Sequence, residues 1–330
     1  MKKTLTIIST IVFTFLAINS IAKAEIKVVA SIKPIHSLAS YVMDGVGKPD
    51  IIVDGYNSPH NFSLKPSHAK MIEKANLIIW VGEDLETFLE KPLKTISKDA
   101  VNVEIMDLKG IKKLKFREKN IFEGHDDHGH GHKEHKEHGH DEHKEHGHKE
   151  KKHDDHGHEG HAHGEHDPHV WLDPMNAKII VKEIENQLVK LDPDNASKYK
   201  ANSKKAQSEL DNLTKNIKKD LKKDLRFVVF HDAYQYFENR FGIKVLGALT
   251  VNPDVLPGAE QLSEIREVIE HEKVNCLFSE PQFNPAIIKS IAKDTKIKTE
   301  VLDPLGATIN KGKGMYAELL SNMYASFKGC

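Results

Sequence analysis

The chain has 330 residues, of which 38% are hydrophobic, and its 48 basic and 49 acidic side chains leave a formal net charge of -1. A length of this order suits two domains of common size. A net charge so close to zero gives no indication of a nucleic acid or an anionic membrane surface as the partner. The function must therefore be sought in local patterns along the chain.

Residues 1–24 have the pattern of a cleaved secretory signal peptide. Two lysines precede an apolar run over residues 5–21, and Ala22-Lys23-Ala24 supplies the small residues that signal peptidase reads. A permanent membrane anchor is the alternative, but the apolar run is short for a span and ends in a cleavage pattern. We expect an exported, soluble mature protein that begins at Glu25.

Residues 25–192 alternate strands with helical stretches and are predicted to form an N-terminal α/β lobe. The strand candidates are short, apolar and rich in β-branched residues. They cover Ile26–Ser31, Asp50–Val53, Asn76–Val81 and Val101–Met106. The helix candidates between them, with Ser67 as a plausible N-cap, cover His36–Met43, Ser67–Lys74 and Leu85–Leu93. Such alternation predicts a parallel sheet with helices on both faces.

A histidine-rich tract interrupts this lobe. The 42 residues from His125 to His166 hold 16 of the 22 histidines of the chain, among Gly, Lys, Glu and Asp. A segment this polar cannot bury enough apolar surface to offset the entropy of ordering, so we expect a disordered loop over residues 124–166. Imidazole is a common ligand for zinc and neighbouring transition metals. The tract therefore indicates metal binding, and a solvated polar linker is the alternative.

A long lysine-rich helix in residues 193–225 is predicted to join this lobe to the next. It follows a helix candidate at Ala177–Leu191, and its apolar residues recur at helical spacings of three and four. These residues are Leu210, Leu213, Ile217 and Leu221. No proline or glycine after Pro193 offers a hinge, so we expect a stiff connection.

The alternation of strands and helices returns in residues 226–330, which are predicted to form a C-terminal α/β lobe. The strand candidates are Arg226–Phe230, Lys244–Leu249, Val274–Ser279 and Thr299–Leu302. The helix candidates are Tyr234–Phe241, Ala259–Glu270 and Pro285–Ala292. The predicted fold class is therefore α/β, with two parallel-sheet lobes joined by a long rigid helix.

Three of the six histidines outside the tract stand where strands or loops end. His60 follows the second strand candidate, and His231 comes directly after the Arg226–Phe230 strand candidate. His169 lies in a proline-bounded loop. Ligands of doubly wound sheets bind beyond the carboxyl ends of the strands, so two facing lobes would gather these side chains around one cleft. Asp303, at the end of another strand, adds a carboxylate. Three imidazoles and one carboxylate suit tetrahedral zinc.

Each of these residues also has a purely structural interpretation. A single histidine at such a position can be a core or capping residue, and an aspartate before a proline, such as Asp303, also serves in turns. Glu280, which ends a strand as well, could support a metal ligand or cap the next turn. The other histidines fall on helical stretches, and we interpret them as structural or surface residues: His36, His68 and His271.

Six segments together resemble the zinc-binding periplasmic receptors of high-affinity zinc-uptake ABC transporters, within the metal-binding group of solute-binding proteins. They are Ser31–Pro34, Ser58–Ser67, His169–Pro174, Val229–Tyr234, Ser279–Phe283 and Leu302–Gly306. The resemblance covers essentially the whole mature chain. It implies two α/β lobes on a rigid helix, with a charged histidine-rich loop at the place of the tract. It also implies a periplasmic, monomeric, non-enzymatic protein that captures Zn²⁺ for a membrane permease and its ATPase.

The resemblance also implies the metal ligands. By position, His60, His169 and His231 match the three histidine ligands, and Asp303 matches the carboxylate that many relatives use as the fourth. Manganese-binding relatives place a glutamate where this chain has His231, which favours zinc. Some zinc members carry a glutamate where this chain has Pro59, so the fourth ligand here is either Asp303 or water.

The only cysteines are Cys276 and Cys330. In an exported protein, two cysteines favour one disulfide over a CxxC metal site or a redox pair, and two unpaired thiols are the alternative. Some members of the resembled family have a disulfide between cysteines that match Cys276 and a position near the C-terminus. We therefore expect a bridge that pins the C-terminal segment to the domain.

Two other functions fit parts of the pattern. A secreted zinc hydrolase could activate water at an open position on three histidines, but the chain has no HExxH pair and no evident general base. An assay of hydrolysis beside metal binding would separate the two. A metal store or metal-dependent adhesin would make the tract the whole function, and the histidines at strand ends argue against that.

Overall fold

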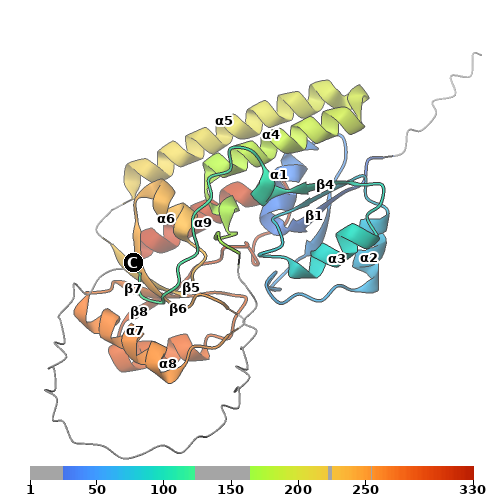
Figure 1. Cartoon of the computed structure of the whole chain (residues 1–330). Helices are drawn as coiled ribbons and strands as arrows, with labels where there is room; N and C mark the ends of the chain where they lie inside the picture. Colours follow the sequence, from blue (N-terminus) through green and yellow to red (C-terminus); the bar gives the residue numbers. More distant parts are fainter. Residues whose placement is uncertain (1–24, 123–163, 222–224, 254) are drawn as a thin grey trace, which may run out of the picture.

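The structure is a computed structural model that describes residues 25–122, 164–221, 225–253 and 255–330 (Figure 1). The predicted signal peptide and most of the predicted histidine-rich loop lie outside these residues. Among the helices of the described ranges, none has the length and apolar character needed to cross a membrane.

The N-terminal lobe contains a parallel sheet with the strand order β2-β1-β3-β4. Its strands are β1 (Val28–Ile32), β2 (Asp50–Val53), β3 (Leu77–Trp80) and β4 (Val101–Glu104). Its helices are α1 (Lys33–Val42), α2 (Pro66–Glu73) and α3 (Thr87–Thr95). The predicted alternation is present, but the fourth strand ends two residues before Met106, because Ile105–Asp107 form a 3-10 turn.

Two helices begin at other residues than predicted, because a proline lies in the first turn of each. Ser67 is not the N-cap of α2, because Pro66 occupies the first turn and Lys65 is the capping residue. Helix α1 likewise begins at Lys33, three residues earlier than expected, with Pro34 in its first turn. The fixed φ of proline suits a first helical turn, and its missing N–H leaves no donor unsatisfied there.

The C-terminal lobe repeats the same topology, with a parallel sheet in the order β6-β5-β7-β8. Its strands are β5 (Arg226–His231), β6 (Lys244–Thr250), β7 (Cys276–Ser279) and β8 (Lys298–Val301). Its helices are α6 (Gln235–Phe241), α7 (Ala259–His271) and α8 (Ala286–Thr295). Two parallel-sheet α/β lobes are therefore present, and the predicted fold class is confirmed.

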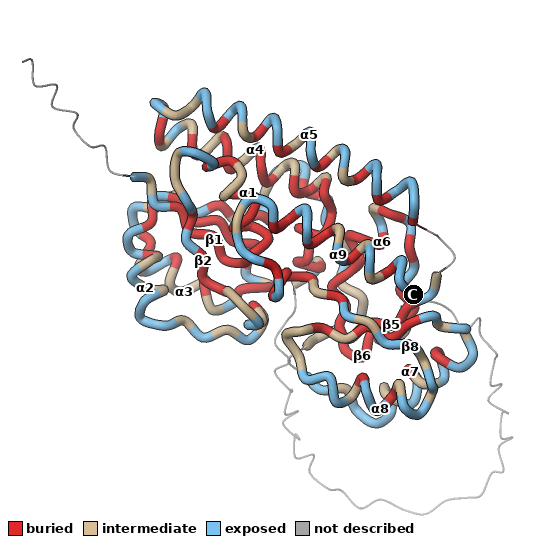
Figure 2. The backbone as a smooth tube through the Cα atoms, turned by 180° about the vertical axis from the view of Figure 1, so that it is seen from behind, coloured by how far each residue is buried: buried red, intermediate tan, exposed pale blue. Residues whose placement is uncertain are grey.

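Two long helices join the lobes. Helices α4 (Pro174–Leu191) and α5 (Ala196–Asp220) lie side by side across both lobes (Figure 1). The outer face of α5 is exposed and its inner face is buried (Figure 2), as the predicted apolar stripe requires. An ion pair of 2.7 Å between Lys178 and Asp211 links the two helices. The unbroken α5 supports the expected stiff connection, but the predicted helix over 193–225 is too long at both ends, because Pro193–Asn195 form a 3-10 turn and Leu221 is extended.

A final helix, α9 (Met315–Gly329), is absent from the strand and helix candidates above. It packs against α1 and α5, and its buried side chains recur at helical spacing, so the sequence does carry its signal. They are Met315, Tyr316, Leu319, Leu320, Met323 and Phe327. Helix α9 therefore contacts α1 of the first lobe and α5, while its end is joined to the C-terminal sheet.

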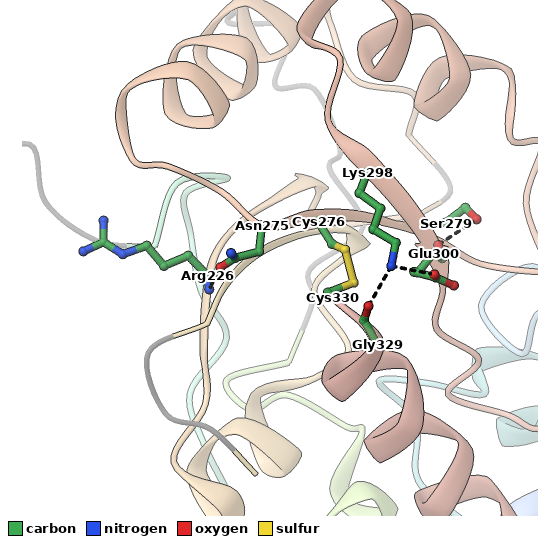
Figure 3. The surroundings of a disulfide bond; sticks show 8 residues. All are labelled: Arg226, Asn275, Cys276, Ser279, Lys298, Glu300, Gly329 and Cys330. Carbon is green, nitrogen blue, oxygen red and sulfur yellow. Dashed lines mark hydrogen bonds and ion pairs between the residues drawn. A yellow bond between two sulfur atoms is a disulfide. The ribbon is translucent and has the colours of Figure 1, made fainter.

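The predicted disulfide is present between Cys276 and Cys330, whose Cα atoms lie 5.9 Å apart (Figure 3). It joins the start of β7 to the end of α9. Beside it, Nζ of Lys298 donates a hydrogen bond of 2.6 Å to the carbonyl oxygen of Gly329. The end of the chain is thus fixed to the C-terminal sheet by one covalent and one polar contact.

The lobes share a hydrophobic core. One continuous cluster runs from Val29 in the N-terminal sheet through Ile184 of α4 and Phe327 of α9 to Phe278 in the C-terminal sheet. A second cluster lies on the other face of the C-terminal sheet, under α7 and α8. The two lobes are therefore held together by apolar packing as well as by the connecting helices.

The chain on either side of the histidine-rich tract is anchored to the body of the protein. Before the tract, Ile121 forms an antiparallel bridge with Gly247 on the edge strand β6. At its other end, His166, the last residue of the tract, forms an antiparallel bridge with Lys115. The predicted loop over residues 124–166 is thus too long at its end, because His166 takes part in backbone pairing.

Candidate metal centre

His60, His169 and His231 meet between the two lobes. His60 lies in the loop after β2, His169 precedes a 3-10 turn at Val170–Leu172, and His231 is the last residue of β5. Their ring centroids are 5.4 Å (His60–His169), 5.7 Å (His60–His231) and 5.2 Å (His169–His231) apart. One ring nitrogen of each lies within 4.8 Å of the others, so the three rings together could hold a metal ion.

Buried carboxylates orient two of the imidazoles. Oδ1 of Asp167 accepts hydrogen bonds from the Nδ1 and the backbone N of His169, at 2.7 and 2.9 Å. Oε1 of Glu280 accepts from Nδ1 of His231 at 2.7 Å and from the hydroxyl of Tyr234 at 3.0 Å. A carboxylate only accepts, so Nδ1 carries the proton in both rings and Nε2 offers its lone pair. These two Nε2 atoms lie 3.3 Å apart.

Asp303 lies in a turn that follows β8, directly before Pro304 and Leu305, which line the cavity with the three rings. Its Oδ1 accepts hydrogen bonds from the backbone N of Gly306 at 2.8 Å, the backbone N of Leu305 at 3.2 Å and Nε2 of Gln282 at 2.8 Å. Its Oδ2 is buried and has no hydrogen-bond partner among the described residues. Asp303 is not in the set whose ligand atoms lie within 4.8 Å of one another, so the fold places it near the histidines rather than among them.

The cavity at this site is small and mostly apolar, and two of its lining residues carry buried oxygen atoms. Its volume is about 10 Å³, and the three histidines line it together with Glu280, Gln282, Pro304 and Leu305. Oε2 of Glu280 and Oε1 of Gln282 are buried without a hydrogen-bond partner in the part of the chain that the structure describes. Buried, unbonded oxygens of this kind leave negative potential that a cation would offset.

Two buried acidic side chains outside the histidine cluster form ion pairs with an arginine. Arg117 donates to Oδ1 of Asp232, the neighbour of His231, at 3.0 Å and to both carboxylate oxygens of Glu238, at 3.1 and 3.0 Å. Burial raises the pKa of Asp232 and of Glu238, and the guanidinium lowers both. Sequence reasoning missed Arg117, whose partners lie more than a hundred positions away. It also missed Asp167, although its place two residues before His169 suits a side chain that bonds the nearby backbone.

The three described histidines outside both the site and the tract lie at structural or surface positions, as predicted. Nε2 of His36 donates to the carbonyl oxygen of Pro49 at 3.1 Å, and burial lowers the pKa of this ring. Nδ1 of His68 accepts from the backbone N of Lys65 at 3.2 Å in the first turn of α2. His271 is an exposed residue at the end of α7. The site therefore draws on the three histidines that stand at strand and loop ends.

The family model for the periplasmic zinc-uptake complex component A matches residues 28–330. The chain belongs to this family. The high-affinity zinc uptake system protein ZnuA of Brucella abortus is 48% identical over 314 residues, which cover 94% of this chain and 93% of that protein. The ZnuA of Haemophilus influenzae is 38% identical over 353 residues, which cover 100% and 99%. The resemblance seen in the sequence is thus confirmed over the whole chain.

The zinc-uptake component A family also accounts for the fold. A crystal structure of ZnuA covers 93% of this chain and 99% of its own, with a TM-score of 0.71 and 21% identity, a likeness that shows the fold alone. Family membership makes the chain a periplasmic zinc-binding component of a zinc-uptake ABC system. The cluster of His60, His169 and His231 is the candidate site for this zinc.

Proposed function

We propose that the chain captures Zn²⁺ between its lobes with His60, His169, His231 and Asp303, and passes the ion to a membrane ABC permease with its ATPase. The observation that carries this proposal is the convergence of three imidazoles, two of which are oriented by carboxylates. Three histidine nitrogens and a carboxylate oxygen form a donor set that zinc binds well. The buried Oδ2 of Asp303 supports this residue over water as the fourth ligand.

The size of the cavity favours capture over catalysis. Pockets for small organic substrates usually measure several hundred cubic ångströms. The cavity here, at about 10 Å³, suits a single small ion. A zinc hydrolase would need room for a substrate beside its metal, so we propose a binding protein and not an enzyme.

The rest of the proposal concerns the mature protein. Residues 1–24 are a signal peptide that is cleaved on export to the periplasm, and the mature protein is a monomer. Residues 25–192 form the first lobe, the segment 193–225, which contains α5, links the lobes, and residues 226–330 form the second lobe. The histidine-rich tract gathers zinc at many weak sites and raises its local concentration near the cleft.

Metal titration of the mature protein with and without residues 125–166 tests the proposal. We expect two affinity classes in the intact protein and a single tight zinc site after the deletion. In the shortened protein, His60→Ala should abolish tight binding, and His271→Ala, which changes an exposed histidine on α7, should not. A shortened protein that binds no zinc tightly would show that the cleft is not the site.

A further inference from the structure

Lys33 is a buried lysine that joins the two lobes. It is the first residue of α1 and only 5% exposed. Its Nζ donates to three carbonyl oxygens of the segment after β8: Gly306 at 2.5 Å, Ile309 at 2.6 Å and Ala307 at 3.2 Å. An ammonium group has three donors, so each one has a partner from the other lobe.

The position of Lys33 is unfavourable for a lysine on local grounds. A cation at a helix N-terminus faces the positive end of the helix dipole, and the first turn of α1 has no acidic residue. Burial lowers the pKa of Lys33, while the carboxylates of Asp54 and Asp303 raise it. Residues that break a local rule in this way are expected at functional or strained sites. A lysine at this position is therefore explained by its contacts with the segment after β8.

Lys33 holds the turn that contains Asp303. The backbone N of Gly306 donates to Oδ1 of Asp303 at 2.8 Å, while the carbonyl oxygen of the same residue accepts from Lys33. Gly306 has a φ of +67°, and an added Cβ would lie 2.1 Å from Cε of Met315. The turn thus has a left-handed conformation that favours glycine, and Lys33 ties this conformation to the other lobe.

We propose that Lys33 is a positioning residue for zinc binding, which ties the Asp303 turn of the C-terminal lobe to the first lobe and so holds it at the three histidines. This inference rests on the proposed function, in which Asp303 is a zinc ligand. Without the ammonium group, the buried carbonyl oxygens of Ala307 and Ile309 lose this donor and that of Gly306 keeps only the backbone N of Ile309, so the turn is free to shift away from the rings. The carboxylate then binds the ion in a poorer position, and the affinity for zinc falls.

A double-mutant cycle on the mature protein without residues 125–166 tests this role. The variants are Lys33→Met, Asp303→Asn and the double variant, with Lys313→Met as the matched control. Lys313 also joins the segment after β8 to the first lobe, through an ion pair of 2.6 Å with Asp44, but on the surface. Zinc affinity is measured by competition with a chelating dye, and visible absorption of bound Co²⁺ reports the ligand geometry.

We expect Lys33→Met to lower zinc affinity at least 10-fold, in the range seen for residues that orient metal ligands. Lys313→Met should stay within twofold of the parent protein. In the Asp303→Asn background, Lys33→Met should cost less than twofold, because the side chain through which it acts is already impaired. The Co²⁺ spectrum of Lys33→Met should shift toward that of Asp303→Asn.

Two outcomes overturn the role of Lys33: an affinity equal to that of Lys313→Met, or the same loss with and without Asp303→Asn. Normal zinc affinity in Asp303→Asn alone would instead remove Asp303 from the proposed ligand set, which separates the two failures. If circular dichroism shows that Lys33→Met does not fold, Lys33→Gln, which keeps one donor group, is judged by the same criteria.

Discussion

Oε1 of Glu280, the residue after β7, accepts a hydrogen bond of 2.7 Å from Nδ1 of His231, at the end of the neighbouring strand β5. Both side chains are buried, and the hydroxyl of Tyr234 donates to the same oxygen. A carboxylate in this position fixes the ring and makes its other nitrogen a better electron donor. The pair is the kind of support that a histidine ligand needs.

Glu280→Gln should lower zinc affinity roughly 10- to 100-fold, because the amide keeps the shape but loses the negative charge. Titration of the protein without residues 125–166 measures the effect. Glu300→Gln, a change at a half-exposed residue on β8 that pairs with Lys298, is the control and should bind zinc normally. Equal zinc affinities for the two variants would mean that the negative charge of Glu280 does not contribute to zinc binding.

His231→Glu should weaken zinc binding and narrow the difference between the affinities for zinc and manganese. Manganese prefers oxygen ligands, whereas a mostly imidazole site favours zinc. Parallel titrations with the two metals, on the protein without the tract, give the ratio. If neither affinity changes, His231 is not a ligand, despite its place in the cluster.

Glu86→Gln should flatten the pH dependence of stability of the metal-free protein. Burial raises the pKa of Glu86 to about 7 from the ordinary 4.5, although Val81 and Gly82 donate to its carboxylate. The folded protein keeps this proton between pH 4.5 and 7 and the unfolded chain does not. This contribution to stability is therefore full below pH 4.5 and is lost as the pH rises through 7.

The pKa difference corresponds to a loss of roughly 3 kcal/mol in the free energy of unfolding. Urea unfolding at several pH values across this window measures it. Glu90→Gln, at an exposed position on α3, should leave the decline unchanged. A Glu86→Gln protein that loses as much stability as the parent over this window would assign the decline to other groups.

Cys276→Ser should destabilise the attachment of α9 to the C-terminal sheet and should have little effect on the affinity for zinc. The bridge joins residues 54 positions apart, and chain entropy gives roughly 4 kcal/mol for a loop of that length. Hydrogen exchange of residues 315–330 should accelerate, while zinc affinity stays within a few-fold. Complete loss of tight zinc in a folded variant would contradict this and would implicate sulfur in the site.

Much of the fold could be predicted from the sequence, because both sheets are parallel and buried. Such strands are short continuous apolar runs, and β2 was predicted with its observed ends. The ends of other elements moved where proline chemistry or a 3-10 turn took over, as at Pro66 and Ile105–Asp107. The prediction does not include helix α9, because the alternation of strands and helices ends with the last strand. Its buried apolar residues nevertheless recur at helical spacing.

The candidate site could be predicted only in part. The three histidines have a local signal, since each stands at the end of a strand or in a proline-bounded loop. Lys33 and Arg117 have none, because their partners lie far away in the sequence and only the folded chain brings them together. Whether an ammonium group meets three carbonyl oxygens is decided by tertiary packing, which no pattern of neighbouring residues encodes.

The backbone bridges at Ile121 and His166 bear on how this protein can change in evolution. They fix the two points at which the histidine-rich insertion leaves and rejoins the folded body. For a polar segment closed between fixed ends, each doubling of length costs only about 0.6 kcal/mol of closure entropy. Repeats can therefore be gained or lost between the bridges at little cost to stability. Under the proposed function, the number of histidines in the tract can then change while the folded body keeps its sequence.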